Sequence, residues 1–164
     1  MSLAYFEQRE KSLLGDRYET LYTPCRQRAE RGITVNALRA SVQEVAGRMG
    51  ALCEPSPFCP QGLVLLGEQV KPGRHPYYHA GVYYSQEPSA SSAAALLEVQ
   101  PGMRVLDLCA APGGKSSQLG SALGGQGLLV SNEYNASRAE ILKSNLERMG
   151  FPNAVILNES TDHI

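Results

Sequence analysis

The spacing of apolar residues predicts two helices in the first fifty residues of the chain. Apolar side chains recur at helical spacing among charged residues over 6–14, and Gly15 is placed to end that helix. A second helix is expected over 41–50. Ser41 and Glu44 have the three-residue spacing of a capping box, and a glycine stands at the end of the segment.

The middle of the chain predicts short strands separated by turns. Residues 35–39 form a mixed segment that could be a strand, and the run Leu-Val-Leu-Leu at 63–66 is a second candidate. The sequence Lys-Pro-Gly at 71–73 is a turn signal. The tyrosine-rich segment 76–85 is expected to be loop followed by strand, because Pro76 argues against a helix there.

From residue 89 onward the pattern changes to alternating helices and strands. A helix of small residues is expected over 89–97, and strand-length apolar runs then alternate with helical segments. The expected strands are 105–108, 127–132 and 154–157, and the expected helices are 116–123 and 136–149. The last helix carries an apolar face at steps of three and four, made of Ala139, Leu142, Leu146 and Met149. This alternation indicates a parallel sheet with right-handed crossovers.

We therefore expect an α/β fold in two parts. A small α+β domain would occupy residues 4–75, and the first three strands of a doubly wound sheet would occupy residues 76–164. In such a partial sheet, the strand at 105–108 would have an unpaired edge rich in Val and Leu. Exposed apolar edges associate with other chains, so we expect self-association through this edge, or aggregation or incomplete folding.

The composition is that of a globular chain with a near-neutral charge. Hydrophobic residues make up 43% of the 164 residues, charged residues 19%, and the formal net charge is -1. Any contact with nucleic acid must therefore use a local patch. Five arginines lie in the first part, at Arg26, Arg28, Arg31, Arg39 and Arg48. They could form such a patch or a solvated surface, and the sequence leaves both interpretations open.

The chain carries no motif for a metal, a membrane span or secretion. Its four cysteines, Cys25, Cys53, Cys59 and Cys109, include no C-x-x-C pair, and His75 and His79 are read as surface or packed histidines. There is no run of 18 apolar residues and no basic segment followed by an apolar one at the N-terminus. We expect reduced thiols, a cytoplasmic location and no membrane partner.

The most informative segment is 105–116, where an apolar strand runs into a turn with two glycines and then a helix. Small residues there let the backbone approach a ligand, in the crevice where open α/β sheets bind ligands. Gly114-Lys115-Ser116 matches the end of a phosphate-binding Walker A loop. That loop also needs a glycine five residues before Gly114, and Cys109 stands there, which argues against an ATPase or a GTPase.

An acidic residue completes a candidate nucleoside site. Glu133 closes the second strand, twenty residues after Gly113, where doubly wound sheets place the acid that accepts hydrogen bonds from ribose hydroxyls. The alternative is that Glu133 caps the following helix. Without a pyrophosphate loop, this pair suits an adenosine without phosphates, such as S-adenosylmethionine (SAM). Asp107, inside the strand, is expected to accept hydrogen bonds from amides of the glycine turn.

The segment Leu-Asp-Leu-Cys-Ala-Ala-Pro-Gly-Gly-Lys at 106–115 resembles the cofactor motif of the Sun-domain RNA cytosine-5 methyltransferases, in their bacterial ribosomal-RNA branch. Residues 84–89, the segment 132–134 with Arg138, and the N-terminal segments 6–15 and 35–39 are also similar to that family. The resemblance implies SAM as cofactor and RNA, ribosomal by the branch, as partner. It assigns cofactor binding to Cys109, Ala110, Ala111, Pro112, Gly113, Gly114, Lys115, Glu133 and Arg138, and to Ser160 at the adenine.

Two departures from the family pattern stand out. At the position of the family's adenine-binding acid this chain has Ser160, with Glu159 beside it. The family's cysteine nucleophile, which adds to C6 of cytosine, and its second cysteine lie in motifs that are expected beyond Ile164, so no catalytic residue is assigned here. Cys109 is expected to pack as a small apolar residue in the turn.

The sequence therefore favours an N-terminal part of an RNA cytosine-5 methyltransferase that transfers no methyl group by itself. A non-catalytic module that binds RNA or SAM is the alternative, and cofactor binding without turnover in a longer chain would favour it. A methyltransferase with a small-molecule substrate is a third interpretation, which the N-terminal resemblance disfavours.

Overall fold

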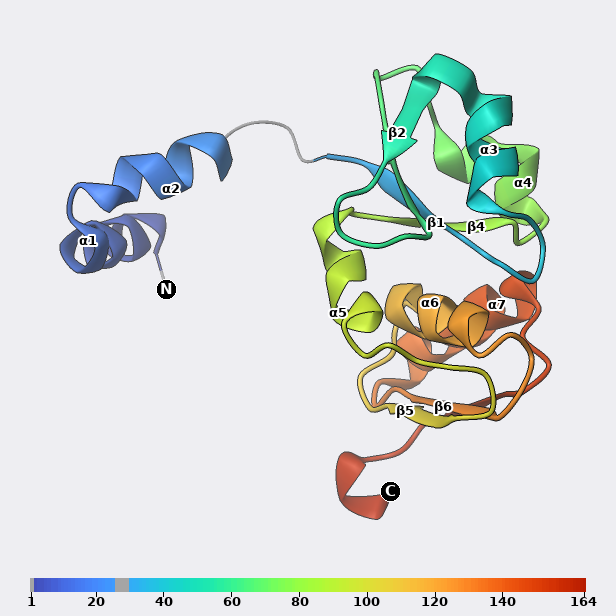
Figure 1. Cartoon of the computed structure of the whole chain (residues 1–164). Helices are drawn as coiled ribbons and strands as arrows, with labels where there is room; N and C mark the ends of the chain where they lie inside the picture. Colours follow the sequence, from blue (N-terminus) through green and yellow to red (C-terminus); the bar gives the residue numbers. More distant parts are fainter. Residues whose placement is uncertain (1, 26–29) are drawn as a thin grey trace.

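The computed structural model describes residues 2–25 and 30–164, and it begins with two packed helices, α1 (Leu3–Leu14) and α2 (Arg17–Cys25). The Ser2 side chain caps α1, and Gly15 ends it as predicted. The ring of Phe6 meets that of Tyr22 edge-on, with centroids 5.9 Å apart, so the two helices share an aromatic contact. Figure 1 shows this helical pair apart from the rest of the chain.

A four-stranded antiparallel sheet follows, in the order β2-β3-β1-β4. Its strands are β1 (Gly32–Val35), β2 (Cys53–Pro55), β3 (Gly62–Leu65) and β4 (Tyr83–Gln86), and α3 (Val42–Met49) packs on it. The capping box of Ser41 and Glu44 is present, as predicted. The expected strand at 35–39 is wrong except for its first residue. The strand ends at Val35, and Asn36 begins a turn in which its carbonyl accepts from the amides of Arg39 and Ala40.

Short helical segments connect these strands: η1 (Gly50–Leu52), η2 (Pro72–Arg74) and α4 (Pro76–His79). The expectation that Pro76 excludes a helix is wrong. Pro76 is the first residue of α4, where its missing N–H has no helical acceptor to lose. His75 caps this helix by accepting from the amide of Tyr77 at 3.2 Å. Among the residues that the structure describes, no cluster of His, Cys, Asp or Glu could hold a metal ion.

The second part is a three-stranded parallel sheet in the order β5-β6-β7, as the alternating pattern predicts. Its elements, in chain order, are η3 (Ser89–Ser91), α5 (Ser92–Ala95), β5 (Arg104–Asp107), α6 (Gly114–Ala122), β6 (Leu128–Asn132), α7 (Ala136–Met149), β7 (Ala154–Leu157) and η4 (Thr161–His163). The predicted apolar face of α7 is buried. Within the described residues β5 pairs with β6 alone, so its other edge is unpaired.

The two helices α6 and α7 lie between the antiparallel sheet and the parallel sheet (Figure 1). Asn36, which is fully buried, joins the two parts: its Nδ2 donates to the carbonyls of Gly81 at 3.0 Å and Met149 at 2.9 Å. The amide of Ala37 donates to Oγ of Ser121 in α6 at 2.8 Å. Buried hydrogen bonds restrict the geometry of the interface between the two parts. The antiparallel part therefore holds α6 and α7 in place, and these two helices pack against the parallel sheet.

The pairing of β4 with β1 indicates where the first domain ends. The boundary expected between residues 75 and 76 falls just before α4, whereas β4 is hydrogen-bonded to β1 along its whole length. We propose that the first domain extends through β4, to about residue 88. None of the described helices is long and apolar enough to cross a bilayer.

Candidate functional site

The turn that follows β5 is built around one buried glycine and one carboxylate. Gly113 adopts a φ of 112°, and a Cβ there would stand 3.2 Å from Cδ1 of Leu142, so the position favours glycine. Asp107 accepts from the hydroxyl of Ser116 at 2.7 Å and from the amide of Cys109 at 3.4 Å. The expected bond from Asp107 to the turn is present, but the shorter bond comes from Ser116, which sequence reasoning missed.

Ser116 separates this turn from a Walker A loop. Its side chain is fully buried, it donates to Asp107, and it accepts from the hydroxyl of Ser131 in β6 at 3.0 Å. In a Walker A loop this hydroxyl coordinates Mg²⁺ beside the phosphates. Lys115, the other residue of that motif, is exposed. Because the hydroxyl of Ser116 is hydrogen-bonded to Asp107 and Ser131 in the interior, it does not face a ligand at the turn. This argues further against phosphate binding by the turn.

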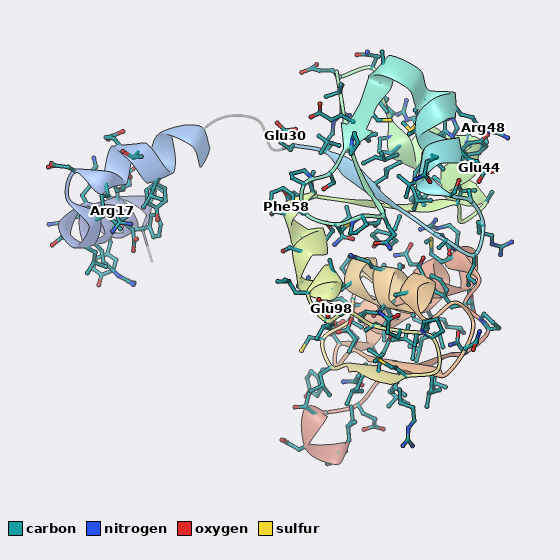
Figure 2. All side chains as sticks on the ribbon, in the orientation of Figure 1. Arg17, Glu30, Glu44, Arg48, Phe58 and Glu98 are labelled. Atoms are coloured by element: carbon teal, nitrogen blue, oxygen red, sulfur yellow. The ribbon has the colours of Figure 1, made fainter. Side chains whose placement is uncertain are left out.

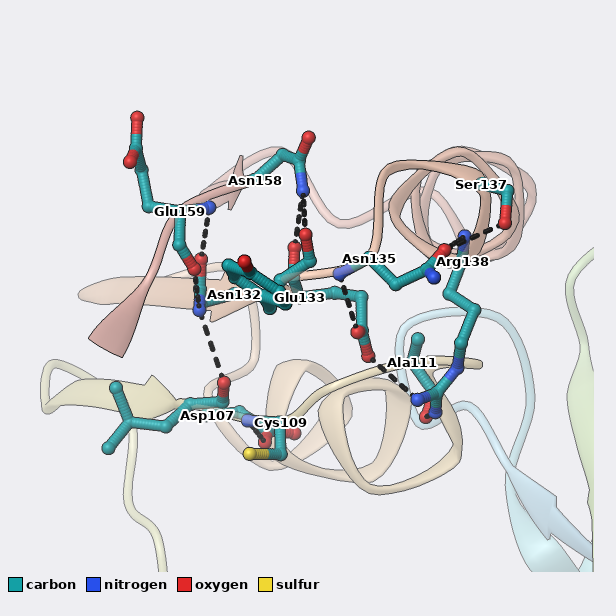
Figure 3. Close-up of polar contacts among 12 residues, drawn as sticks. Asp107, Cys109, Ala111, Asn132, Glu133, Asn135, Ser137, Arg138, Asn158 and Glu159 are labelled. Atoms are coloured by element: carbon teal, nitrogen blue, oxygen red, sulfur yellow. Dashed lines mark hydrogen bonds and ion pairs between the residues drawn. The ribbon is translucent and has the colours of Figure 1, made fainter. Parts of the chain in front are cut away.

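Glu133 and Arg138 connect the end of β6 to the same turn. The Glu133 side chain is buried, one of its carboxylate oxygens accepts from the amide of Asn135 at 3.0 Å, and the other lies 3.4 Å from Nη1 of Arg138. The same guanidinium donates through Nη2 to the carbonyl of Ala111 at 2.9 Å. Figure 3 shows the Glu133 carboxylate between Asn135 and Arg138, on the side of β6 that faces the turn.

The side chain that caps α7 is that of Asn135, two residues after Glu133. The side chain of Asn135 accepts from the amide of Arg138 and so forms the N-cap of α7, while Glu133 accepts from the amide of Asn135 just outside that helix. Each carboxylate oxygen has two acceptor positions, and each oxygen of Glu133 uses one of them. The carboxylate therefore keeps acceptor capacity for a ligand hydroxyl.

Two asparagines tie the three strand ends together, and sequence reasoning missed both. Asn132 is fully buried, and its Nδ2 donates to the carbonyls of Leu108 at 3.2 Å and Glu159 at 3.0 Å. Its Oδ1 accepts from the amide of Glu159 at 3.0 Å. Asn158 donates to the carbonyls of Glu133 at 2.7 Å and Tyr134 at 2.9 Å (Figure 3). The sequence signal that could have identified them is a polar residue at the end of an apolar run: Asn132 ends the run at 127–132, and Asn158 follows the run at 154–157.

The remaining predicted residues of the turn divide between buried and exposed positions. Ala110 and Ala111 are buried, and the carbonyl of Pro112 accepts from Nδ2 of Asn145 at 2.8 Å and from the hydroxyl of Tyr84 at 3.3 Å. Gly114 begins α6. Cys109 is exposed, which corrects the expectation that it packs as an apolar residue. It follows β5, which pairs on one side only within the part of the chain that the structure describes.

Ser160 lies beyond the end of β7, beside the segment that Asn132 holds. Its hydroxyl accepts from the amide of Asp162 at 3.4 Å and so caps η4, while the neighbouring Glu159 carboxylate lies 3.5 Å from Nδ1 of His163. The structure therefore brings Ser160 to the same edge of the sheet as Glu133, but it places Ser160 in a local turn.

The five arginines of the expected RNA patch and the tyrosines of the segment 76–85 fall into four groups. Tyr83 and Tyr84 are buried, and burial raises the pKa of Tyr83 to about 12, so both belong to the core. Arg31 donates to the carbonyls of Val70 and Gly67 and closes a loop. Arg26 and Arg28 lie outside the described residues. Arg39 and Arg48 lie at the surface, and Tyr77 and Tyr78 are half-buried.

Comparison with known proteins gives consistent matches along the chain. Residues 4–88 match the model of the N-terminal domain of 16S rRNA methyltransferase RsmF, and residues 94–164 match that of 16S rRNA methyltransferase RsmB/F. Ribosomal RNA small subunit methyltransferase F of Shewanella amazonensis is 37% identical over 127 residues, covering 76% of this chain and 26% of the relative. Its counterpart in Pectobacterium atrosepticum is 35% identical over 147 residues, covering 84% and 30%.

Solved structures agree with these matches. A methyltransferase homologue from Pyrococcus horikoshii superposes with a TM-score of 0.87 at 28% identity, over 97% of this chain and 53% of that one. NSun6 from Pyrococcus horikoshii, at 15% identity, shares the fold with a TM-score of 0.81 over 94% of this chain and 64% of that one. The chain spans less than a third of the length of the curated relatives described here. The chain belongs to the family of 16S rRNA methyltransferase RsmF, whose N-terminal-domain model matches residues 4–88, just over half of the chain.

Proposed function

We propose that this chain is the cofactor-binding part of a SAM-dependent RNA cytosine-5 methyltransferase that acts on ribosomal RNA in the cytoplasm. The observation that carries the proposal is the arrangement of Glu133, Arg138 and Ala111, which sets a buried carboxylate against the turn after β5. The family's relatives are named as ribosomal RNA methyltransferases, which supports RNA as the substrate.

The residues at this edge of the sheet fit an adenosine-containing ligand without phosphates. Glu133 keeps free acceptor positions for ribose hydroxyls, and Arg138 holds its carboxylate in place. The hydroxyl of Ser116 is directed inward, so the turn lacks the metal ligand that a triphosphate site needs. We propose that the turn 109–115 approaches the methionine portion of SAM, and that the segment with Ser160 borders the adenine.

SAM, when bound, would supply an electrophilic methyl group. The residues of this chain would bind and orient it: Glu133 would fix the ribose, Arg138 would hold the acid and the turn together, and Asn132 would keep the three strand ends in register. Of the cysteines with described side chains, Cys59 is buried, Cys53 has its pKa raised by burial, and Cys109 belongs to the turn. We therefore propose that this chain alone transfers no methyl group, which incorporation of labelled methyl into RNA by the purified chain would refute.

Calorimetry with SAM tests the cofactor assignment. Replacing Glu133 with alanine removes a charged acceptor, so the binding free energy should weaken by roughly 1.5–3 kcal/mol. The control is Glu140→Ala, which removes an exposed carboxylate from α7, the helix that follows Glu133. This variant should bind SAM as the wild type does. Equal affinities of wild type and Glu133→Ala would exclude the ribose contact, and the absence of any SAM binding by the wild type would exclude the site.

We also propose that the chain self-associates through the unpaired edge of β5. Leu106 in that strand is 50% exposed, and unpaired backbone groups beside apolar side chains form a template for a second strand.

A further inference from the structure

A surface cavity of about 190 Å³ lies where α3, α4 and the start of β4 meet, apart from the strand ends of the parallel sheet. Val45 and Val82 contribute its apolar lining. Arg39, Arg48 and Tyr77 contribute the polar groups, together with Glu44. The cavity thus combines two guanidinium groups with an aromatic ring, which are the groups that proteins use to bind a nucleic-acid strand.

Arg48 is held in place by Tyr77. It lies in the last turn of α3, donates to the hydroxyl of Tyr77, and has its guanidinium carbon 5.7 Å from the centroid of that ring. A guanidinium carries five N–H donors, and this bond uses one of them. Within the described residues no other hydrogen bond of Arg48 is formed, so its remaining donors can bind an anion.

Arg39 reaches the same cavity from the turn after β1. Its guanidinium lies against Gly150, the left-handed residue that ends α7, so closely that a Cβ at Gly150 would collide with Nη2. A cation at the C-terminus of a helix is stabilised by the helix dipole. The guanidinium of Arg39 thus lies beside the end of α7, and among the described residues it forms no ion pair with a carboxylate.

The charge around the cavity is positive. Glu44 is engaged by Ser41, whose amide and hydroxyl both donate to it at 2.8 Å, and these bonds, followed by the charge of Arg48, lower the pKa of Glu44. Figure 2 shows Glu44 and Arg48 on α3, at the outer side of the domain. The two arginines outweigh this single carboxylate. A third arginine, Arg148 of α7, stacks on the neighbouring Tyr78 with 3.9 Å between its guanidinium carbon and the ring centroid.

This surface is also continuous with the turn of the candidate cofactor site. Arg148 donates to Oδ1 of Asn145 at 3.2 Å, and Asn145 donates to the carbonyl of Pro112 at 2.8 Å. Two side chains thus connect the arginine-rich surface to the turn 109–115. An RNA strand whose target base approaches that turn would run across the neighbouring surface.

We propose that Arg39, Arg48 and Tyr77 form a binding site for a phosphodiester of single-stranded RNA, with Arg148 extending the path toward the cofactor turn. This inference rests on the proposed function, because it takes RNA as the strand that the domain binds. The guanidinium groups would hold the phosphate through charge-assisted hydrogen bonds, and the sugar or base next to it would contact the ring of Tyr77.

The test measures binding of a fluorescently labelled single-stranded RNA oligonucleotide to the 164-residue chain at several salt concentrations. Arg39→Gln and Arg48→Gln should each weaken binding roughly threefold to tenfold. Each should also lower the slope of log K against log salt by about 0.7, the value for one phosphate contact on a single strand. Arg48→Lys keeps the charge and should keep the slope.

The control is Arg104→Gln, which removes the same charge from an exposed position on β5 and should leave the slope unchanged. Thermal melting of every variant shows whether it is folded, and SAM calorimetry on the same samples should give wild-type affinity. If the glutamine variants bind RNA with wild-type affinity and slope, the phosphodiester site is refuted while the proposed function stands. If the wild type binds no RNA at low salt, the inference is refuted, and its SAM binding then reports separately on the cofactor site.

Discussion

At the scale of single residues, Arg138 has two partners in the candidate cofactor site, since it contacts the Glu133 carboxylate and donates to the carbonyl of Ala111. Replacing Arg138 with lysine keeps the charge but removes the fork that reaches both partners. We expect SAM affinity to fall roughly tenfold, which corresponds to about 1.4 kcal/mol. Calorimetry measures it, with Lys143→Gln on the same helix as the control. Unchanged affinity in Arg138→Lys would show that the bridge is dispensable.

Of the two asparagines that join the strand ends, we expect Asn132 to contribute more to the free energy of unfolding. Replacing it with alanine leaves the carbonyls of Leu108 and Glu159 and the amide of Glu159 without a side-chain partner. We expect a loss of about 1–3 kcal/mol in the free energy of unfolding, measured by urea denaturation. Asn158→Ala should cost less, because Asn158 is exposed. An equal or larger loss for Asn158→Ala would contradict this ranking.

At the scale of elements, Glu87 caps the start of η3. Its carboxylate accepts from the hydroxyl of Ser89 at 2.6 Å and from the amides of Ser89 and Ala90 at 3.1 and 3.0 Å. The bond from the Ser89 side chain is the main cause of its lowered pKa. The stabilisation is therefore present at neutral pH, and it is lost as the pH falls through the lowered pKa of the folded state.

This cap gives a pH-dependent prediction. Glu87→Ala should lower the free energy of unfolding by about 1 kcal/mol at pH 7. The difference between variant and wild type should shrink as the pH falls below about 4.5, where the unfolded carboxyl group takes up a proton, and it should vanish below the lowered pKa of the folded state. Urea denaturation between pH 3 and pH 7 measures both quantities. A difference that stays constant with pH would exclude the charged cap.

Elements set by local sequence could be predicted, and those set by distant contacts could not. The end of α1 at Gly15, the capping box of α3 and the apolar face of α7 all follow from residues within one or two turns of each other. The start of β1, the turn at Asn36 and the helix at Pro76 were missed. Asn36 is held by Gly81 and Met149, far along the chain, and no local pattern reports such partners.

The same distinction applies to the candidate site. The turn 109–115 and Glu133 were predictable, because a strand, a glycine turn and an acid at a fixed offset form a local signature. Ser116, Asn132 and Asn158 were not, because their role is to bond to neighbouring strands. A polar side chain that closes an apolar run can be seen in a sequence, but its partners depend on strand order.

At the scale of the whole molecule, α6 and α7 lie on the same face of the parallel sheet, and among the described residues only the short η4 is drawn beyond the other face (Figure 1). Leu106, Val130 and Val155 stand opposite each other on the three strands, and Leu106 and Val155 are 50% and 45% exposed. This apolar row lies next to the unpaired edge of β5. Together they form the surface through which we expect copies of the chain to associate.

Sedimentation velocity tests this association. The wild type should sediment as more than one chain, with a concentration-dependent mass. Leu106→Lys should shift the mass toward that of a single chain, because a charge on an edge strand opposes strand pairing. Leu97→Lys, which changes an exposed leucine outside the sheet, should behave as the wild type does. A monomeric wild type would refute the association.

The buried amide of Asn36 has a consequence for how the chain can be divided. A protein cut after residue 88 would lose the Met149 carbonyl and the Ser121 hydroxyl that the Asn36 turn uses, and Tyr84 would lose the core formed with Leu142 and Phe151. The N-terminal domain expressed alone would therefore expose to solvent a face that is buried in the whole chain. The two domains are better regarded as one cooperative folding unit than as separable modules.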